Sequence, residues 1–390
     1  MARPYFVPGN RLTLLRNGAE FFPALEAAID GATREVHLQT YIFRADGAGT
    51  RIAEAMKRAA ARGVAVRLLI DGFGSSELPE KFAAALREAG VSLLYFRPDP
   101  SRWQLKRNRL RRMHRKVAVA DGRVAFIGGI NIEDDIQPGG PPAPRFDFAV
   151  AVEGPLVAPI HHMARRLWGL VAWSQLRRRQ AVPVPPASTA LPGDQRSALV
   201  RRDNLRHRQD IERAYLDAIA AARSEVLIAN AYFLPGRRFR RALVEARQRG
   251  ARVVLLLQGR VEYALQHYAT RALYGSLLAA GVEIHEYQKS YLHAKVACVD
   301  QRWATVGSSN IDPFSLLLAR EANIVVDHEG FAGELREDLL RAIREDSEPV
   351  HGQRWREEPL RDRVLSWLAY GAVRWIMGVA GYGYHDEPLA

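Results

Sequence analysis

The sequence has almost no cysteine, since Cys298 is the only one in 390 residues. A single thiol cannot form an intramolecular disulfide, so a disulfide scaffold and a cysteine-based zinc site are both excluded. Hydrophobic residues make up 48% of the chain and charged residues 25%, which are ordinary globular values. Disordered and fibrous classes are therefore excluded as well. The length allows two or three domains.

Long apolar runs are also scarce. Residues 1–10 lack an apolar core of signal-peptide length, so we expect no secretory export. Near the C-terminus, residues 364–384 carry one charge, Arg374, which would cost about 2.5–3.5 kcal/mol at a bilayer centre. Arg363, Ser366 and Tyr370 share one helical face with Arg374. The apolar positions of the other face are Leu365, Leu368, Ala372, Trp375 and Val379. This pattern favours a helix lying in a membrane interface, and the alternatives are a core-packing helix and a true span.

Acidic residues are too few to balance the basic ones, which leaves a net charge of +13. The surplus indicates an acidic partner: nucleic acid, a membrane surface or a phosphorylated substrate. Its densest run, Arg102–Lys116, has eight Lys and Arg residues and leads into a motif described below. We interpret it as a rim that attracts anionic phospholipid. The runs at 177–179 and 237–241 either add to this rim or are solvated. With Trp103 as its only aromatic residue, the dense run is a poor stacking platform for single-stranded nucleic acid.

The chain repeats one series of elements. Buried strands are expected at 34–43, 64–71 and 91–96, and again at 225–233, 251–257 and 282–287. Helices that end at a glycine are expected at 52–62 and 82–89, and again at 238–249 and 268–280. Alternation of strand and helix implies parallel strands with helices on the sheet faces. The sequence therefore predicts a duplicated α/β fold.

The boundary between the two copies is visible as a proline-rich stretch without periodicity, residues 181–196. We expect a first repeat at 1–180, a linker at 181–196, and a second repeat at 197–350. Residues 351–390 form a tail with the amphipathic, membrane-facing helix.

Each copy carries the same polar motif at the same relative place. The first copy has His114, Lys116, Asp121 and Asn131, and the second has His293, Lys295, Asp300 and Asn310. The offset between the copies is 179 positions throughout. Because side chains alternate along a strand, the His and Lys of each copy share a face. A purely structural repeat has little reason to keep these two polar residues on a sheet face twice.

These motifs resemble the phospholipase D superfamily, whose mark is His-x-Lys-x4-Asp followed by Gly-x-x-Asn. The run 111–131 is similar to that of bacterial cardiolipin synthases of the short B-type branch. Thr40–Phe43, Asp71–Gly74 and Glu153–Pro155 fit the same branch, and the likeness covers about residues 10–375. It implies two tandem repeats around a pseudo-two-fold axis, each a mixed, mostly parallel sheet flanked by helices.

Two histidines that meet at such an axis suit a two-step phosphoryl transfer. One imidazole would attack phosphorus to form a phosphohistidine, and the other would act as acid and then as base. Lys116 and Lys295 would neutralise the phosphate oxygens, so neither a metal nor another cofactor is expected. Asn131 and Asn310 would donate to the same oxygens. Ser308 would add a hydroxyl in the second copy only, where the first has Gly129.

The resemblance also implies roles for the remaining polar residues. An acidic residue downstream of each motif orients its histidine, which would pair Asp147 with His114 and Glu321 with His293. The motif places Asp121 and Asp300 among the catalytic residues, and the family likeness implies that they anchor the strand ends through salt bridges more than they touch substrate. The adjacent His161 and His162 are interpreted as surface residues. By likeness to duplicated relatives, His114 is favoured as nucleophile and His293 as acid and base.

The implied reaction moves a phosphatidyl group onto the glycerol hydroxyl of phosphatidylglycerol and forms cardiolipin. Phosphatidylglycerol is the favoured donor, and phosphatidylethanolamine is an alternative. Hydrolysis of phospholipid, cleavage of nucleic acid by a superfamily nuclease, and membrane binding by a protein with dead sites remain as other interpretations. We expect an enzyme on the cytoplasmic side of a bacterial inner membrane, bound peripherally to anionic phospholipid, with no nucleic-acid partner.

Overall fold

The computed structural model describes residues 4–98, 111–136, 139–176, 190–203, 206–352 and 360–379. The strands of the first half are β1 (Val7–Arg16), β2 (Glu35–Thr40), β3 (Ala65–Asp71), β4 (Ser92–Phe96), β5 (Lys116–Ala120), β6 (Val124–Gly128) and β7 (Phe148–Glu153). Its helices are α1 (Asn17–Asp30), α2 (Gly47–Ala61), α3 (Glu80–Glu88) and α4 (Val157–Ser174).

The second half has a similar order of elements. Its strands are β8 (Gln195–Arg202), β9 (Glu225–Asn230), β10 (Arg252–Gln258), β11 (Glu283–Tyr287), β12 (Lys295–Val299), β13 (Trp303–Gly307), β14 (Glu321–Asp327) and β15 (Ser347–Pro349). Its helices are α5 (Asp210–Ala221), α6 (Arg237–Gln248), α7 (Ala264–Arg271), α8 (Tyr274–Ala279), α9 (Pro313–Leu317), α10 (Glu329–Asp346) and α12 (Leu360–Val379). The expected helix over 268–280 is divided into α7 and α8 by a turn at Ala272 and Leu273.

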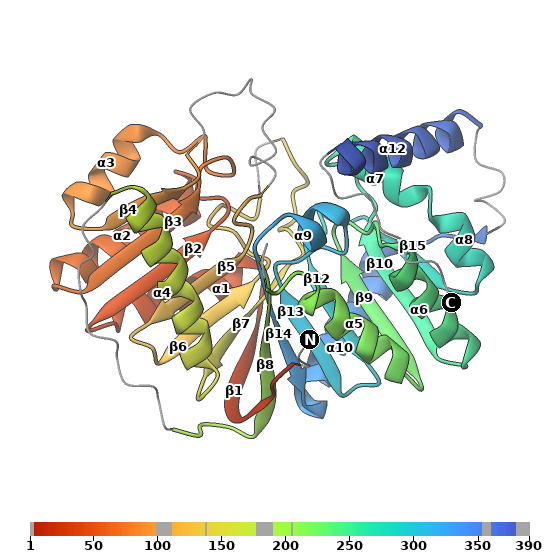
Figure 1. The fold of residues 1–390 in the computed structure, drawn as a ribbon, viewed down its shortest axis with the longest axis horizontal. Helices are drawn as coiled ribbons and strands as arrows, with labels where there is room; N and C mark the ends of the chain where they lie inside the picture. The colour runs from red at the N-terminus through yellow and green to blue at the C-terminus, as the bar shows by residue number, and fades with distance from the viewer. Residues whose placement is uncertain are drawn as a thin grey trace.

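All fifteen of these strands form one sheet, in the order β15-β11-β10-β9-β12-β13-β14-β8-β1-β7-β6-β5-β2-β3-β4 (Figure 1). Strands β1 and β8 pair antiparallel at its centre and join the two halves. The predicted α/β class with a mixed sheet in each repeat is confirmed. The two repeats therefore share a single continuous sheet.

The prediction that the strands are mostly parallel is wrong. Within the described sheet, the parallel pairs are β2–β3, β3–β4, β9–β10 and β10–β11. Helical crossovers connect these strands, and such connections permit parallel pairing. In each half, two of the later strands are joined by a short turn, β5–β6 and β12–β13, and a short turn permits only antiparallel pairing.

Helices cover both faces of each half. In the first half, α1, α2 and α3 pack on one face and α4 on the other. In the second half, α5, α6, α7 and α8 pack on one face and α10 on the other. The central strands are thus buried on both sides, which explains their near-continuous apolar sequences.

Helix α12 packs against α7 with a side of mixed character, whose Ala369 joins a core cluster of the second half (Figure 1). Ser366 and Val373 are buried against the protein, with Tyr370 beside them. Leu368 and Trp375 point away from it and are 65% and 70% exposed. The outward side thus exposes large leucine and tryptophan side chains, which a helix on a water-soluble surface usually buries. No helix within the described ranges is long and apolar enough to cross a membrane.

Candidate active site

Each motif histidine lies just before a central strand, and the opposite half of the molecule holds it in place. The backbone N–H of His114 donates to the Arg320 carbonyl at 3.1 Å, and that of His293 donates to the Phe146 carbonyl at 2.9 Å. Arg320 directly precedes β14, and Phe146 lies two residues before β7. Because these two strands flank the β8–β1 pair, both histidines come to the junction of the repeats.

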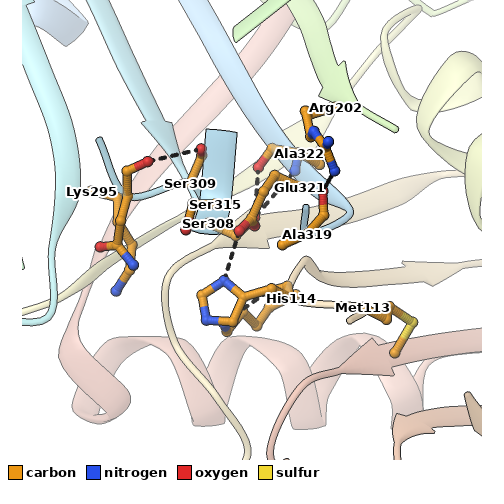
Figure 2. A network of polar contacts seen from close by, with 12 residues as sticks. Met113, His114, Arg202, Lys295, Ser308, Ser309, Ser315, Ala319, Glu321 and Ala322 are labelled. Carbon is orange, nitrogen blue, oxygen red and sulfur yellow. Dashed lines mark hydrogen bonds and ion pairs between the residues drawn. The ribbon is translucent and has the colours of Figure 1, made fainter. Parts of the chain in front are cut away.

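The side chains of the histidines cross the junction as well. His114 Nδ1 lies 2.9 Å from Glu321 Oε1, as Figure 2 shows, and His293 Nδ1 lies 2.6 Å from Asp147 Oδ2. The predicted pairing of each histidine with the acid of its own repeat is therefore wrong. Asp147 and Glu321 do bind the histidines, but each binds the histidine of the other repeat. Strands β7 and β14 lie beside the central β1–β8 pair, where each carboxylate reaches the opposite half.

These bonds determine which ring nitrogen can react. An Nδ1–H that donates to a carboxylate fixes the tautomer and leaves the lone pair on Nε2. Lys116 Nζ lies 3.3 Å from His114 Nε2 and donates to the His114 carbonyl at 2.8 Å. Lys295 Nζ donates to the His293 carbonyl and lies 3.9 Å from Asp147 Oδ2. A phosphate at Nε2 would thus meet an ammonium group beside each imidazole.

Burial and neighbouring cations shift the pKa values of these groups. Burial lowers the pKa of His114, and burial together with Lys295 and Arg145 lowers the pKa of His293 well below its usual value. Both imidazoles are therefore neutral at pH 7. Burial also lowers the pKa of Lys116 to about 8 and that of Lys295 to about 7. Burial raises the pKa of Asp147 to about 6, against the opposing effect of Lys295.

The second position of the Gly-x-x-Asn stretch differs between the copies because the neighbouring acids differ. Ser308 is fully buried and its Oγ donates to Glu321 Oε2 at 2.5 Å. In the first copy, a Cβ on Gly129 would overlap Asp147 Oδ1, so a side chain there would displace the carboxylate that binds His293. The hydroxyl predicted to bind phosphate is thus engaged with the carboxylate that orients His114.

The two asparagines follow β6 and β13 at the same edge of the sheet. The Asn131 amide donates to Glu133 Oε1 at 3.2 Å and accepts from the Ile42 N–H at 3.3 Å. Asn310 is buried, and its Oδ1 has no hydrogen-bond partner within the described part of the chain. Contact with phosphate remains a prediction for both residues.

Tyr41 was missed as a site residue. Its ring centroid lies 4.8 Å from that of His114, and Lys116 Nζ lies 5.5 Å from the ring centre. Burial raises the pKa of its hydroxyl. The position of Tyr41 directly after β2, the neighbour of β5, was the signal that could have identified it.

Asp121 and Asp300 lie at the far ends of β5 and β12 from the histidines. Lys116 and Asp121 are five strand residues apart, which is roughly 17 Å. Asp121 accepts backbone N–H groups of Thr33, Arg34 and Glu35. Asp300 does the same for residues 223–225. Their inclusion among catalytic residues is therefore wrong, and they anchor the strand ends through backbone amides and not through salt bridges.

The prediction that His161 is a surface residue is also wrong. It is buried, and its Nε2 lies 2.8 Å from Glu35 Oε1. With His37 these residues form the one described group whose types could ligate a metal. However, Arg67 and Arg165 already bind the Glu35 carboxylate at 2.6 and 2.8 Å. Two guanidinium groups on one carboxylate fit an ion-pair network better than a cation site.

The second repeat holds the same network without the histidines. Glu225 binds Arg252 and Arg336 on the corresponding strand and helix. The Glu–Arg ion-pair network occurs in both copies, whereas its histidines occur in only one. We therefore assign the network a structural role in both copies.

Part of the predicted basic rim lies inside the protein. Arg112 binds Asp71 at 2.6 Å, and Arg115 is buried and donates to Gln39 at 2.7 Å. These two cations pair with side chains inside the protein and are therefore not part of a solvent-facing rim. The rest of that run, apart from Arg111 and Lys116, lies outside the described residues, as do the arginines at 177–179.

Comparison with known proteins agrees with this geometry. The family model "Cardiolipin synthase, PLD-like domain" matches residues 25–136 and 215–343. Cardiolipin synthase B of Escherichia coli K12 is 39% identical over 96% of this chain and 90% of its own length. Cardiolipin synthase 1 of Bacillus cereus is 28% identical over 90% of this chain and 70% of its own length.

Among solved structures, a phosphatidylserine synthase from Haemophilus influenzae superposes with a TM-score of 0.69 at 14% identity, and each chain is 94% covered. At that identity the likeness concerns the fold alone. The sheet and the paired motifs define an enzyme of the phospholipase D superfamily. The chain belongs to its cardiolipin synthase family and is a phosphatidyltransferase of that type.

Proposed function

We propose that this enzyme forms cardiolipin from two molecules of phosphatidylglycerol and releases glycerol. The observation that carries the proposal is the pair of neutral imidazoles at the repeat junction, each with a carboxylate on Nδ1 and a lysine beside it. The names of the relatives support phosphatidyl transfer to cardiolipin. The donor, the acceptor and the covalent intermediate are parts of the proposal.

In the first step, His114 Nε2 attacks the phosphorus of phosphatidylglycerol. A P–N bond forms, the P–O bond to the headgroup breaks, and His293 gives a proton to the departing glycerol oxygen. Because the free imidazole is neutral, His293 takes up this proton from solvent when substrate binds, since the phosphate adds negative charge to a site that otherwise lowers the pKa of His293. Lys116 and Lys295 neutralise the non-bridging oxygens.

In the second step, the primary hydroxyl of another phosphatidylglycerol replaces glycerol. His293 takes the hydroxyl proton, the oxygen attacks phosphorus, and the P–N bond breaks to return His114. Ser308 acts indirectly, because its hydroxyl holds Glu321, which orients His114. Water in place of the lipid hydroxyl would give hydrolysis by the same route.

The enzyme would work while bound peripherally to the cytoplasmic face of the bacterial inner membrane. The outward apolar face of α12 supports this, since Leu368 and Trp375 lie where a bilayer interface could cover them. The net charge of +13 complements anionic lipid.

The test is direct. Purified protein is incubated with phosphatidylglycerol vesicles in EDTA, and cardiolipin and glycerol are measured by mass spectrometry. Equal amounts of the two products are expected, and neither His114→Ala nor His293→Ala should form them. Cleavage of DNA without any lipid product would refute the proposal, and so would phosphatidic acid as the only lipid product.

A further inference from the structure

A cavity lies between α6, α8 and α12, away from His114 and His293. Its volume is about 260 Å³, and its polar and aromatic lining comes from Arg240, Ser276, Arg363, Ser366, Trp367 and Tyr370. None of these residues contributes to the active site described above. The cavity is therefore a separate feature of the second repeat.

The cavity is cationic. Arg240 Nε is buried and has no hydrogen-bond partner within the described residues. A buried guanidinium N–H without an acceptor is costly, so a bound oxygen atom would stabilise it. Arg363 adds a second guanidinium from α12. The one carboxylate of α6, Glu245, pairs with Arg241 on the exposed side of that helix.

The cavity also adjoins an apolar surface. Trp367 lines it and is nevertheless 61% exposed, so this side chain connects the cavity with the outer face of α12. Leu365 and Leu368 lie on that outer face and are also exposed. At about 260 Å³, the cavity is slightly smaller than pockets that enclose a drug-sized ligand. It has room for a headgroup, and long apolar chains would remain outside.

We propose that this cavity binds the phosphate of an anionic phospholipid headgroup, with the acyl chains lying along the outward face of α12. Arg240 and Arg363 contact the phosphate oxygens, and Trp367 lies at the level of the lipid glycerol. This site holds lipid without reacting with it, because neither His114 nor His293 lines the cavity. It would fix the orientation of the enzyme on the bilayer through one defined lipid.

The test compares two charge-matched double variants of the full chain. Arg240→Gln with Arg363→Gln removes the cavity cations, whereas Arg241→Gln with Arg361→Gln removes one cation from each of the same helices outside the cavity lining. Both carry His114→Ala, so that no lipid is consumed and the result does not depend on the proposed reaction. Binding is measured by flotation with phosphatidylcholine vesicles that contain 0, 10 or 30% phosphatidylglycerol.

We expect the cavity variant to lose at least about tenfold in its partition coefficient on phosphatidylglycerol vesicles, and the matched variant less than about threefold. Equal losses of vesicle binding in the two variants would mean that the cations attract the anionic surface non-specifically, and this would overturn the proposal. Unchanged vesicle binding in both variants would overturn it as well. A parallel titration with sn-glycerol 3-phosphate separates the sources of phosphate. Tight binding of this soluble ligand, with vesicle binding unaffected in the cavity variant, would also overturn the lipid assignment.

Discussion

At the scale of single residues, the two halves exchange the groups that make their histidines reactive. Glu321 of the second half orients His114, and Asp147 of the first half orients His293. A carboxylate on Nδ1 stabilises the charged form of the ring, so the imidazole cannot be considered apart from its partner in the other half. Ser308 adds one more hydrogen bond to this arrangement, because its hydroxyl donates to Glu321.

This arrangement predicts the effect of Glu321→Gln. The change keeps the size of the side chain but removes the charge that raises the pKa of His114. We expect kcat to fall at least about tenfold with little change in KM, and the acid limb of the pH profile to move to lower pH. Glu329→Gln, the same change at a position 81% exposed, is the control. Unaltered kcat and an unaltered acid limb in Glu321→Gln would contradict the role.

The shifted lysines predict the alkaline limb of the profile. In the free enzyme the ammonium forms of Lys295 and Lys116 are lost as pH rises through about 7 and about 8. We therefore expect kcat/KM to decline over this range, and kcat to decline at higher pH because bound phosphate favours the charged lysines. Steady-state rates between pH 5 and 10 measure both. A kcat/KM that stays level to pH 10 would rule out the need for protonated lysines.

At the scale of secondary-structure elements, buried ion pairs fasten the strands to the helices behind them. Glu35 on β2 binds Arg67 on β3 and Arg165 on α4. Burial would raise the pKa of Glu35, but hydrogen bonds from His161, His37 and Arg67 outweigh it and hold that pKa well below its usual range. Loss of the charge leaves two guanidinium groups without a counter-ion.

Glu35→Gln should accordingly lower the free energy of unfolding by about 3–5 kcal/mol, as measured by urea denaturation. The control is Glu80→Gln, which removes an exposed partner of Arg87 and should cost about 0.5 kcal/mol or less. A loss for Glu35→Gln no larger than that of the control would show that the network adds little to stability.

Helix α12 gives the second prediction at this scale. Leu368→Glu with Trp375→Glu places charges on the outward face without touching the side that packs on α7. We expect weaker flotation with anionic vesicles and unchanged thermal stability. Leu191→Glu changes a leucine that is 70% exposed elsewhere on the fold and is the control. If both proteins float equally well, the outward face of α12 does not lie on the membrane.

Most elements and all motif positions could be predicted from the sequence, because strand and helix periodicity is local. Strands β2, β3 and β4 lie within the ranges expected for them. The partners of His114 and His293 could not be predicted, since they depend on how the repeats meet. The burial of His161 was missed for the same reason: its partner Glu35 is more than a hundred residues away.

At the scale of the whole molecule, one sheet of fifteen strands joins the two repeats and brings both motif histidines to one junction. The β1–β8 pair fixes the relation between β7 and β14, and the residues that hold both histidines lie at or just before the start of these two strands. The surplus charge of the chain and the outward face of α12 then suit a bilayer surface as the source of substrate.

The central claim is that His114 and His293 act in one site as nucleophile and as acid. The most direct measurement uses phosphatidyl p-nitrophenol, whose leaving group departs without a proton. His293→Ala should release a burst of one p-nitrophenol per enzyme and keep the phosphatidyl group on His114, as mass spectrometry after an alkaline quench would show. His114→Ala should give no burst. A burst in His114→Ala, or steady turnover in both variants, would contradict the account.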